Sequence, residues 1–376
     1  MHLKSIKLTN FRCHKATKLD FHKGVNILLG KNAVGKTSVV EAISYLSVGK
    51  SHKTNTDQEI IQFNSSYTMI DALLEQEGGN TNLFVAITPE GKRIKRDGKV
   101  LKTISEHVGF LNSVVFSPED VSLLVKSPSE RRRFLDVGIS QIDKEYLIKL
   151  SNYKKLLKQR NELLKMQEVE NFVDKTLLQV ITNELAKQAQ GIIKKREQFI
   201  GELNSYVLEA GKKVSNGNED FKIIYIPNSR SEELNKRYEE RLNYDLFQKT
   251  TSVGPHRDDF MIVESDKNIA TYGSQGQIRT AALSLKLGLS EYYASKGIEM
   301  IVILDDVFSE LDKTRQNKLL ETLKDNNQVF ITTTSIDDID ELLIRNSNII
   351  MVEKGEWVRW VIIKLMKLMI VVISPY

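Results

Sequence analysis

The sequence predicts an α/β fold that a helical segment divides in two. Residues 25–29 and 298–304 form apolar runs of strand length, typical of strands buried on both faces of a sheet. Residues 130–212 contain no proline, and their apolar side chains recur at helical spacing. A glycine-rich loop at residues 30–37 follows the first apolar run directly. We therefore expect one α/β unit whose two parts flank a helical insertion.

The first 128 residues are expected to form the N-terminal part of the α/β unit. Residues 3–8 alternate between apolar and polar side chains, as in a half-buried strand. Further strand-like segments and the turns between them follow at residues 67–70, 78–80, 83–87, 89–91 and 114–116.

The glycine-rich loop has the pattern G-x-x-x-x-G-K-[ST], between a strand-like and a helix-like segment. Such a loop closes backbone N–H groups around phosphates at a helix N-terminus. Lys36 would reach the β- and γ-phosphates and act in catalysis, and Thr37 would bind Mg²⁺. The alternative, a chance glycine-rich turn, fits the strand–loop–helix context less well. The predicted nucleotide site comprises Gly30, Lys31, Asn32, Ala33, Val34, Gly35, Lys36, Thr37 and Ser38.

The amino-acid composition excludes some classes of protein but does not indicate a function. The single cysteine, Cys13, excludes a disulfide framework and suits a reducing cytoplasm, and no secretory signal is expected at residues 1–29. The net charge of +5 includes three cations and no acid in residues 357–376, which leaves about +2 for the remainder. Net charge is therefore weak evidence for a nucleic-acid partner.

Residues 129–215 are expected to form a helical arm. Tyr146, Leu150 and Tyr153 open a helical seam, and a second seam runs from Leu178 to Leu203. We predict an antiparallel, coiled-coil-like helical pair, too short for a long rod.

Residues 216–356 are expected to complete the α/β unit, with a strand at residues 221–226. The apolar run before Asp305 and Asp306 predicts a buried strand that ends in two carboxylates. Asp305 would hold Mg²⁺, and Asp306 would orient or deprotonate an attacking water. The alternative is an acidic helix cap or turn.

A second phosphate-binding surface is predicted where Ser274, Gly276 and Gln277 open a helix. Their hydroxyl and backbone N–H groups would cap the γ-phosphate held by a partner subunit, as the signature of ABC-type ATPases does. The alternative is an ordinary glycine-rich helix start. Residues 330–335 are expected to form another strand with a polar end, and either a phosphate-sensing residue or a plain strand end fits residues 332–334.

Residues 357–376 form an atypical tail. Their apolar stretch of thirteen residues, 361–373, is interrupted by Lys364 and Lys367 and is too short to span a bilayer. A surface anchor, a terminal strand, a helix and a sequence artefact all remain open for this tail.

Four segments together resemble the RecF family of bacterial DNA-repair ATPases: residues 118–136, 254–259, 272–277 and 304–312. The resemblance covers about residues 1–355, and Lys126 stands where the family has a glycine. It implies an ABC-type P-loop ATPase head, split by the helical second domain, that uses ATP and Mg²⁺. It also implies an ATP-gated homodimer, without a membrane role, that binds single-stranded and duplex DNA. The implied partners RecO and RecR help it to load RecA at gaps during replication, recombinational repair and the SOS response.

Basic residues supply candidate DNA contacts. Arg131 and Arg132 would touch phosphates, and so would Lys154, Lys155, Lys158 and Arg160 on the arm. The alternative for each is a solvated helix face or an intramolecular ion pair. No base-reading pattern is visible, so recognition of backbone and shape is expected.

An ATP-gated DNA-binding switch with slow hydrolysis fits these observations best. A transporter ATPase subunit is disfavoured because about 270 residues, including the arm, separate Lys36 from Asp305. The short arm disfavours a long coiled-coil tether, and no acceptor pocket for a small-molecule phosphotransferase is apparent.

Overall fold

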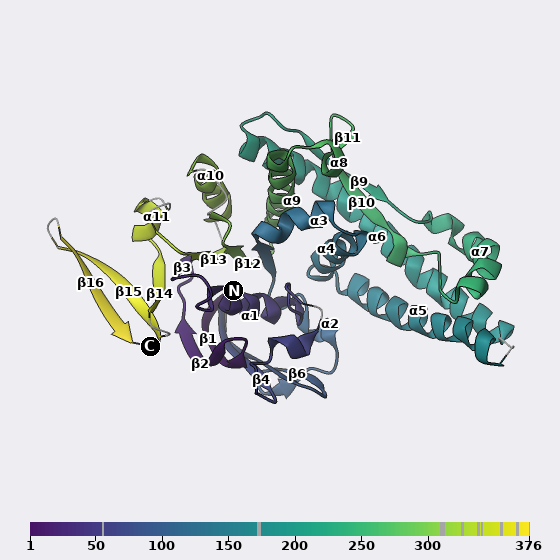
Figure 1. Ribbon diagram of the computed structural model, residues 1–376, viewed down its shortest axis with the longest axis horizontal. Coiled ribbons are helices and arrows are strands. Elements are labelled where there is room, and N and C mark those ends of the chain that lie inside the picture. Colours follow the sequence, from purple (N-terminus) through teal and green to yellow (C-terminus); the bar gives the residue numbers. More distant parts are fainter. Residues whose placement is uncertain are drawn as a thin grey trace. The chain divides into compact units, whose positions relative to one another are not determined.

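The computed structural model describes the backbone of residues 1–375 except residues 55, 171–173, 309–312, 325–326, 337–338, 340, 354–355 and 366–367. The side chains of some further residues, including most of the last twenty, lie outside this description. The chain divides into two compact units, residues 1–119 with 290–376 and residues 120–289 (Figure 1).

The first unit contains an antiparallel sheet of order β2-β1-β4-β5-β6-β7. Buried and more exposed residues alternate along β4 and β5, which leaves one face apolar and one face polar. The strands are β1 (His2–Phe11), β2 (His14–Asp20), β4 (Thr68–Gln76), β5 (Gly79–Thr88), β6 (Gly91–Arg96) and β7 (Lys99–Val100).

A mixed sheet of order β16-β15-β14-β3-β13-β12-β8 forms the other layer of this unit. The strands from β14 to β8 run parallel, and β3, β12 and β13 are buried along their whole length. The strands are β3 (Val25–Leu29), β8 (Ser113–Phe116), β12 (Ile301–Asp305), β13 (Gln328–Thr333), β14 (Asn348–Glu353), β15 (Glu356–Leu365) and β16 (Leu368–Pro375).

The tail takes the terminal-strand alternative. β15 and β16 form a hairpin whose first strand pairs antiparallel with β14. Among the described residues, no helix combines the length and hydrophobicity that crossing a membrane requires.

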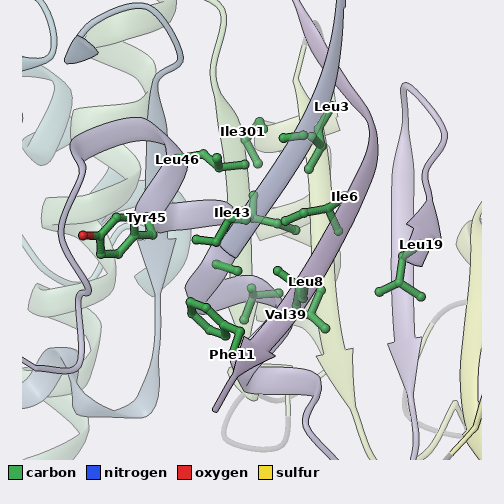
Figure 2. Close-up of a cluster of buried hydrophobic side chains, with 14 of the residues drawn as sticks. Leu3, Ile6, Leu8, Phe11, Leu19, Val39, Ile43, Tyr45, Leu46 and Ile301 are labelled. Atoms are coloured by element: carbon green, nitrogen blue, oxygen red, sulfur yellow. The ribbon is translucent and has the colours of Figure 1, made fainter. Parts of the chain in front are cut away.

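Helix α1 (Lys36–Val48) is almost wholly buried because it contributes to one core with strands of both sheets. Figure 2 shows apolar side chains of β1, α1 and β12 meeting there, including Ile6, Ile43 and Ile301. The remaining helical segments of this unit are η1 (Asp57–Ile60), α2 (Ile104–His107), α10 (Lys313–Lys324) and α11 (Glu341–Arg345). The core fixes the start of α1, and with it the glycine-rich loop.

The second unit is built on two long antiparallel helices, α5 (Lys144–Glu170) and α6 (Lys175–Ser215), as the sequence predicts. A short sheet of order β11-β10-β9 accompanies them: β9 (Phe221–Ile226), β10 (Asp259–Glu264) and β11 (Lys267–Asn268). The other elements are η2 (Pro118–Asp120, at the boundary), α3 (Val121–Val125), α4 (Pro128–Ser140), η3 (Ser231–Glu233), α7 (Leu234–Gln248), η4 (Pro255–Arg257), α8 (Ile269–Tyr272) and α9 (Gln275–Ser295, which continues into the first unit).

The compact unit extends well beyond the predicted arm of residues 129–215. Residues 216–289, which we expected in the α/β unit, belong to it because β9 packs along α6. A Cβ added at Gly211 in α6 would lie 3.0 Å from the buried ring of Phe221 in β9. The sequence revealed the helices and the strand at residues 221–226, but not that this strand packs on α6.

Candidate nucleotide-binding site

The glycine-rich loop opens onto a cavity of about 860 Å³ in the first unit. The cavity brings together residues from the β1–β2 turn, the loop, η1 and the ends of β12 and β13. Its lining residues are Arg12, Cys13, Asn32, Ala33, Gly35, Lys36, Thr37, Ser38, Gln58, Glu59, Ile61, Phe63, Asp306 and Thr332. Most of the predicted loop residues and Asp306 are therefore in one place, and Gly30, Lys31 and Val34 belong to the same loop.

Two left-handed backbone positions shape the loop. Ala33 has a φ of +65°, and Gly35, the N-cap of α1, has a φ of +105°. A Cβ at Gly35 would lie 2.7 Å from His14 Nε2 and 2.8 Å from Cys13 Sγ. Glycine is thus required at this position both for the backbone conformation and for space.

Lys36 curls back over the loop. Its Nζ donates hydrogen bonds to the carbonyl oxygens of Gly30, at 2.7 Å, and Lys31, at 2.8 Å. Burial lowers the pKa of Lys36, while the carboxylates of Asp306 and Asp305 act in the opposite direction. The ammonium group thus forms a positive centre within the loop, close enough to both predicted carboxylates to be affected by their charge.

The acidic pair meets the loop at Thr37. Thr37 Oγ1 donates to Asp305 Oδ1 over 2.9 Å, across 268 positions of sequence. Asp305 is almost completely buried, and its other oxygen lies 3.5 Å from Lys53 Nζ. The hydroxyl and carboxylate that a hydrated Mg²⁺ would require are therefore adjacent.

Thr332 holds the acidic pair in position. Its Oγ1 donates to Asp305 Oδ1 at 2.8 Å and accepts from the backbone N–H of Asp306 at 2.9 Å. The next residue, Thr333, bonds to the backbone of Ser335, and Thr334 is exposed. Two alternatives were open for residues 332–334, a phosphate-sensing residue and a plain strand end. The hydrogen bonds of Thr332 favour a structural role at the strand end for this residue.

Comparisons with known proteins agree with this geometry. Residues 1–354 match the family described as AAA ATPase domain. The chain is 37% identical over 371 residues to the DNA replication and repair protein RecF of Staphylococcus haemolyticus, covering 96% of this chain and 100% of the relative. RecF of Geobacillus thermodenitrificans is 40% identical, with 94% and 98% covered.

This chain belongs to the RecF family. A solved structure described as the recombination mediator protein RecF-ATP in the RecFOR pathway has a TM-score of 0.87 and 35% identity, with 95% of this chain and 97% of that chain covered. An SMC head bound to the C-winged helix domain of ScpA has a TM-score of 0.54 at 16% identity, which supports the fold alone. The predicted ABC-type ATPase fold and the RecF resemblance are both confirmed; Ser309, Glu310, Leu311 and Asp312 lie outside the described residues.

Sequence reasoning about this RecF-family chain missed the part of the cavity lining that the β1–β2 turn contributes beside the loop. Arg12, with a φ of +52°, donates from Nε and Nη2 to the two carboxylate oxygens of Glu41, at 3.0 and 2.7 Å. This hydrogen-bonded pair raises the pKa of Arg12. Beside it, the hydrogen bond with His14 lowers the pKa of the Cys13 thiol. Periodicity gives no sign of these residues, because a turn between strands brings them to the cavity.

The RecF-like signature at residues 272–277 forms a reciprocal helix cap. Ser274 Oγ accepts from the backbone N–H of Gln277 at 3.2 Å, and Gln277 Oε1 accepts from the backbone N–H of Ser274 at 2.9 Å. Ser274 and Gly276 are exposed. Because Ser274 Oγ accepts from Gln277, its own hydroxyl hydrogen points elsewhere, available to an outside acceptor.

The two arginines predicted to touch DNA are engaged within the second unit. Arg131 donates from Nε and Nη2 to the carboxylate of Asp259, at 2.6 and 2.9 Å, and only 11% of its side chain is exposed. Arg132 donates to the carbonyl oxygen of Asp258 at 2.9 Å. The intramolecular alternative therefore fits both residues better than a phosphate contact.

The basic residues proposed for DNA contact in the arm differ in exposure: Arg160 is buried and paired, whereas the lysines are exposed. Arg160 has no exposed surface and pairs with Asp245 at 2.7 Å, so a DNA contact by Arg160 is wrong for this conformation. Lys154 and Lys158 remain exposed, although each has an acidic neighbour within 4 Å. Helical spacing could not distinguish Arg160, since it sits on the inner face of α5.

The RecF-like segment at residues 254–259 also has a structural task. Arg196 in α6 donates to Asp258 at 2.8 Å and to the carbonyl oxygen of Pro255 at 2.7 Å. A Cβ at Gly254, whose φ is +125°, would overlap with the hydroxyl of Tyr153. The motif thus fastens η4 to the two long helices.

Proposed function

We propose that this RecF-family chain is an ATP-switched DNA-binding protein of replication and recombinational repair. The observation that carries the proposal is the junction of Thr37 Oγ1 and Asp305 Oδ1 at 2.9 Å, beside the loop and Lys36. A phosphate loop and an acidic strand end that meet in one cavity are the two halves of an ATPase site.

The residues present fit ATP with Mg²⁺. The loop supplies backbone N–H groups and the helix N-terminus, and Lys36 supplies the cation for the terminal phosphates. Thr37 and Asp305 would hold the metal, which neutralises developing charge on the phosphates. The relatives solved with ATP support the same ligand.

Asp306 is proposed as the residue that orients or deprotonates the attacking water. It lines the cavity, and its backbone is tied to Thr332. Hydrolysis is expected to be slow and to reset a clamp rather than to drive a motor.

The proposed steps beyond ATP binding and hydrolysis are based on membership of the RecF family. ATP-gated homodimerisation would place Ser274, Gly276 and Gln277 over the nucleotide of the other subunit. The ATP-bound dimer would then bind single-stranded and duplex DNA and assist RecA loading at gaps with RecO and RecR. The solved relatives are described as recombination mediator proteins of the RecFOR pathway, which supports these partners.

Replacing Lys36 by Met tests the proposal. One charge-assisted phosphate contact is lost, so ATP affinity should fall at least about tenfold and ATP-dependent retention of DNA should disappear. Lys18→Met, at an exposed position of β2, is the matched control and should bind ATP like the parent. Fluorescent-nucleotide titration and DNA binding with and without ATP give both readouts. Equal ATP affinity in Lys36→Met and the parent would reject the site.

A further inference from the structure

Helix α7 presents two aromatic rings to solvent. Tyr244 is 47% exposed and Phe247 is 79% exposed, and their spacing of three residues places them on one side of the helix. Leu234, Tyr238 and Asp245 are buried, which assigns the opposite side of α7 to the interior of its unit. The exposed aromatic rings are therefore not part of a core.

The same outer side is basic. Arg237 and Arg241 lie seven and three residues before Tyr244, and the Arg241 guanidinium carbon is 5.4 Å from the centre of the Tyr244 ring. Lys236 adds a third cation, and Glu240 adds an acid 3.9 Å from it. Both groups of that ion pair are well exposed, so the pair is weak and easily exchanged for another partner.

The inner side of α7 is held firmly. Asp245 accepts from Arg160 at 2.7 Å and from the backbone N–H of Ser252 at 3.0 Å, and Asp245 and Arg160 have no exposed surface. This buried ion pair joins α7 to α5, so the outer side chains project from a fixed helix. A fixed platform loses little conformational entropy when a ligand stacks on it.

The geometry points to the outer face of α7, formed by Lys236, Arg237, Arg241, Tyr244 and Phe247, as a binding surface for single-stranded DNA. Unpaired bases stack on Tyr244 and Phe247 while the cations contact phosphates. In duplex DNA the bases are stacked inside the double helix, so no base presents a free face on which Tyr244 or Phe247 could stack. The inference rests on the proposed DNA-binding function. It adds which surface binds the DNA and that this surface prefers single-stranded DNA.

An apolar protein partner is the competing occupant, because Tyr and Arg are also frequent at protein interfaces. The charge of the helix surface favours a polyanion, since the three cations outnumber the two exposed acids of α7, Glu239 and Glu240. Aromatic rings set among cations match a base–phosphate repeat better than a neutral apolar surface.

The experiment compares the full-length parent with Tyr244→Ala/Phe247→Ala on a 20-nucleotide single strand and a duplex of equal length, with ATP. Stacking contributes enough per base that single-strand affinity should fall about tenfold or more, while duplex affinity stays within about twofold. Tyr244→Phe keeps the ring and should bind like the parent. Tyr67→Ala, which truncates an exposed ring of the other unit, is the matched control.

A second variant, Arg237→Ala/Arg241→Ala, tests the phosphate contacts. Its affinity for the single strand should fall. The slope of log affinity against log salt concentration should become less negative by about 0.7 for each phosphate contact that is lost. Unchanged single-strand affinity in the aromatic double variant, with folding verified by circular dichroism, would overturn the surface and favour a protein partner. An equal loss on both DNA forms would also overturn it. A parent that binds no DNA in any nucleotide state would instead overturn the proposed function.

Discussion

Asp306 takes a left-handed backbone conformation, with a φ of +58°, directly after β12. Asparagine tolerates this conformation at least as well as aspartate does, so Asp306→Asn should leave the backbone in place. The amide cannot accept a proton from water, while Asp305 would still be present to hold the proposed Mg²⁺. ATP binding should persist and hydrolysis should slow about a hundredfold or more. A single-turnover assay measures the change, and parental turnover would show that the carboxylate role is wrong.

His107 makes stability depend on pH. Burial lowers its pKa from 6.5 to about 4, and neither ring nitrogen has a hydrogen-bond partner among the described residues. The unfolded chain therefore binds the proton first as pH falls, so the contribution of His107 is complete above pH 6.5 and is lost as pH falls toward 4.

His107→Leu should remove this dependence. Between pH 7 and pH 5 the parent should lose about 2 kcal/mol more stability than the variant, because leucine does not titrate. Thermal unfolding at the two pH values measures the difference. Equal losses in the two proteins would assign the acid sensitivity to other groups.

At the scale of elements, the start of α9 depends on a residue from β10. Gln277 Nε2 donates to Glu264 Oε2 at 3.0 Å, which orients the amide so that Oε1 accepts from the backbone N–H of Ser274. Glu264→Ala should loosen this cap by about 1 kcal/mol. Glu264→Gln keeps an acceptor and should retain most of the cap.

Hydrogen exchange at the Ser274 and Gln277 amides, without nucleotide, measures the cap directly. Exchange should be about fivefold faster in Glu264→Ala than in the parent, as a 1 kcal/mol loss implies. Glu209→Ala, at an exposed position of α6, is the control for loss of a carboxylate. Parental exchange rates in Glu264→Ala would show that the helix start does not need β10.

At the scale of the whole molecule, Ser274→Arg separates nucleotide binding from dimerisation. Ser274 is exposed at the start of α9, and we place it opposite the phosphates held by the Lys36 and Thr37 of a second copy. The bulky arginine should block docking, so the variant binds ATP as a monomer yet fails to dimerise, to hydrolyse ATP or to hold DNA with ATP. Sedimentation with ATP, beside a nucleotide titration, measures both parts.

Gln277→Ala is the companion variant, because it removes one bond of the cap without adding bulk. It should dimerise more weakly than the parent but better than Ser274→Arg. Normal ATP-dependent dimerisation of Ser274→Arg would reject the trans arrangement. Loss of ATP binding by the monomer would assign Ser274 to the nucleotide pocket of its own subunit.

The elements whose chemistry is local could be predicted from the amino-acid sequence. Residues 30–37 predict a tight loop before α1, because their glycine spacing suits a phosphate-binding turn and glycine at position 35 readily adopts the φ of +105° found there. The apolar runs specified buried strands, and helical spacing specified α5 and α6. Each of these patterns can be recognised within a short continuous segment of the sequence.

The pairing of polar residues, in contrast, became visible only in the folded chain. Thr332 meets Asp305, and Arg12 meets Glu41, through strands and turns that periodicity does not place in space. Arg131 and Arg160 have the composition of DNA contacts, but packing turns them toward Asp259 and Asp245. Burying a cation requires a paired carboxylate, and a partner about 85 or more positions away in sequence can be identified only after the chain has folded.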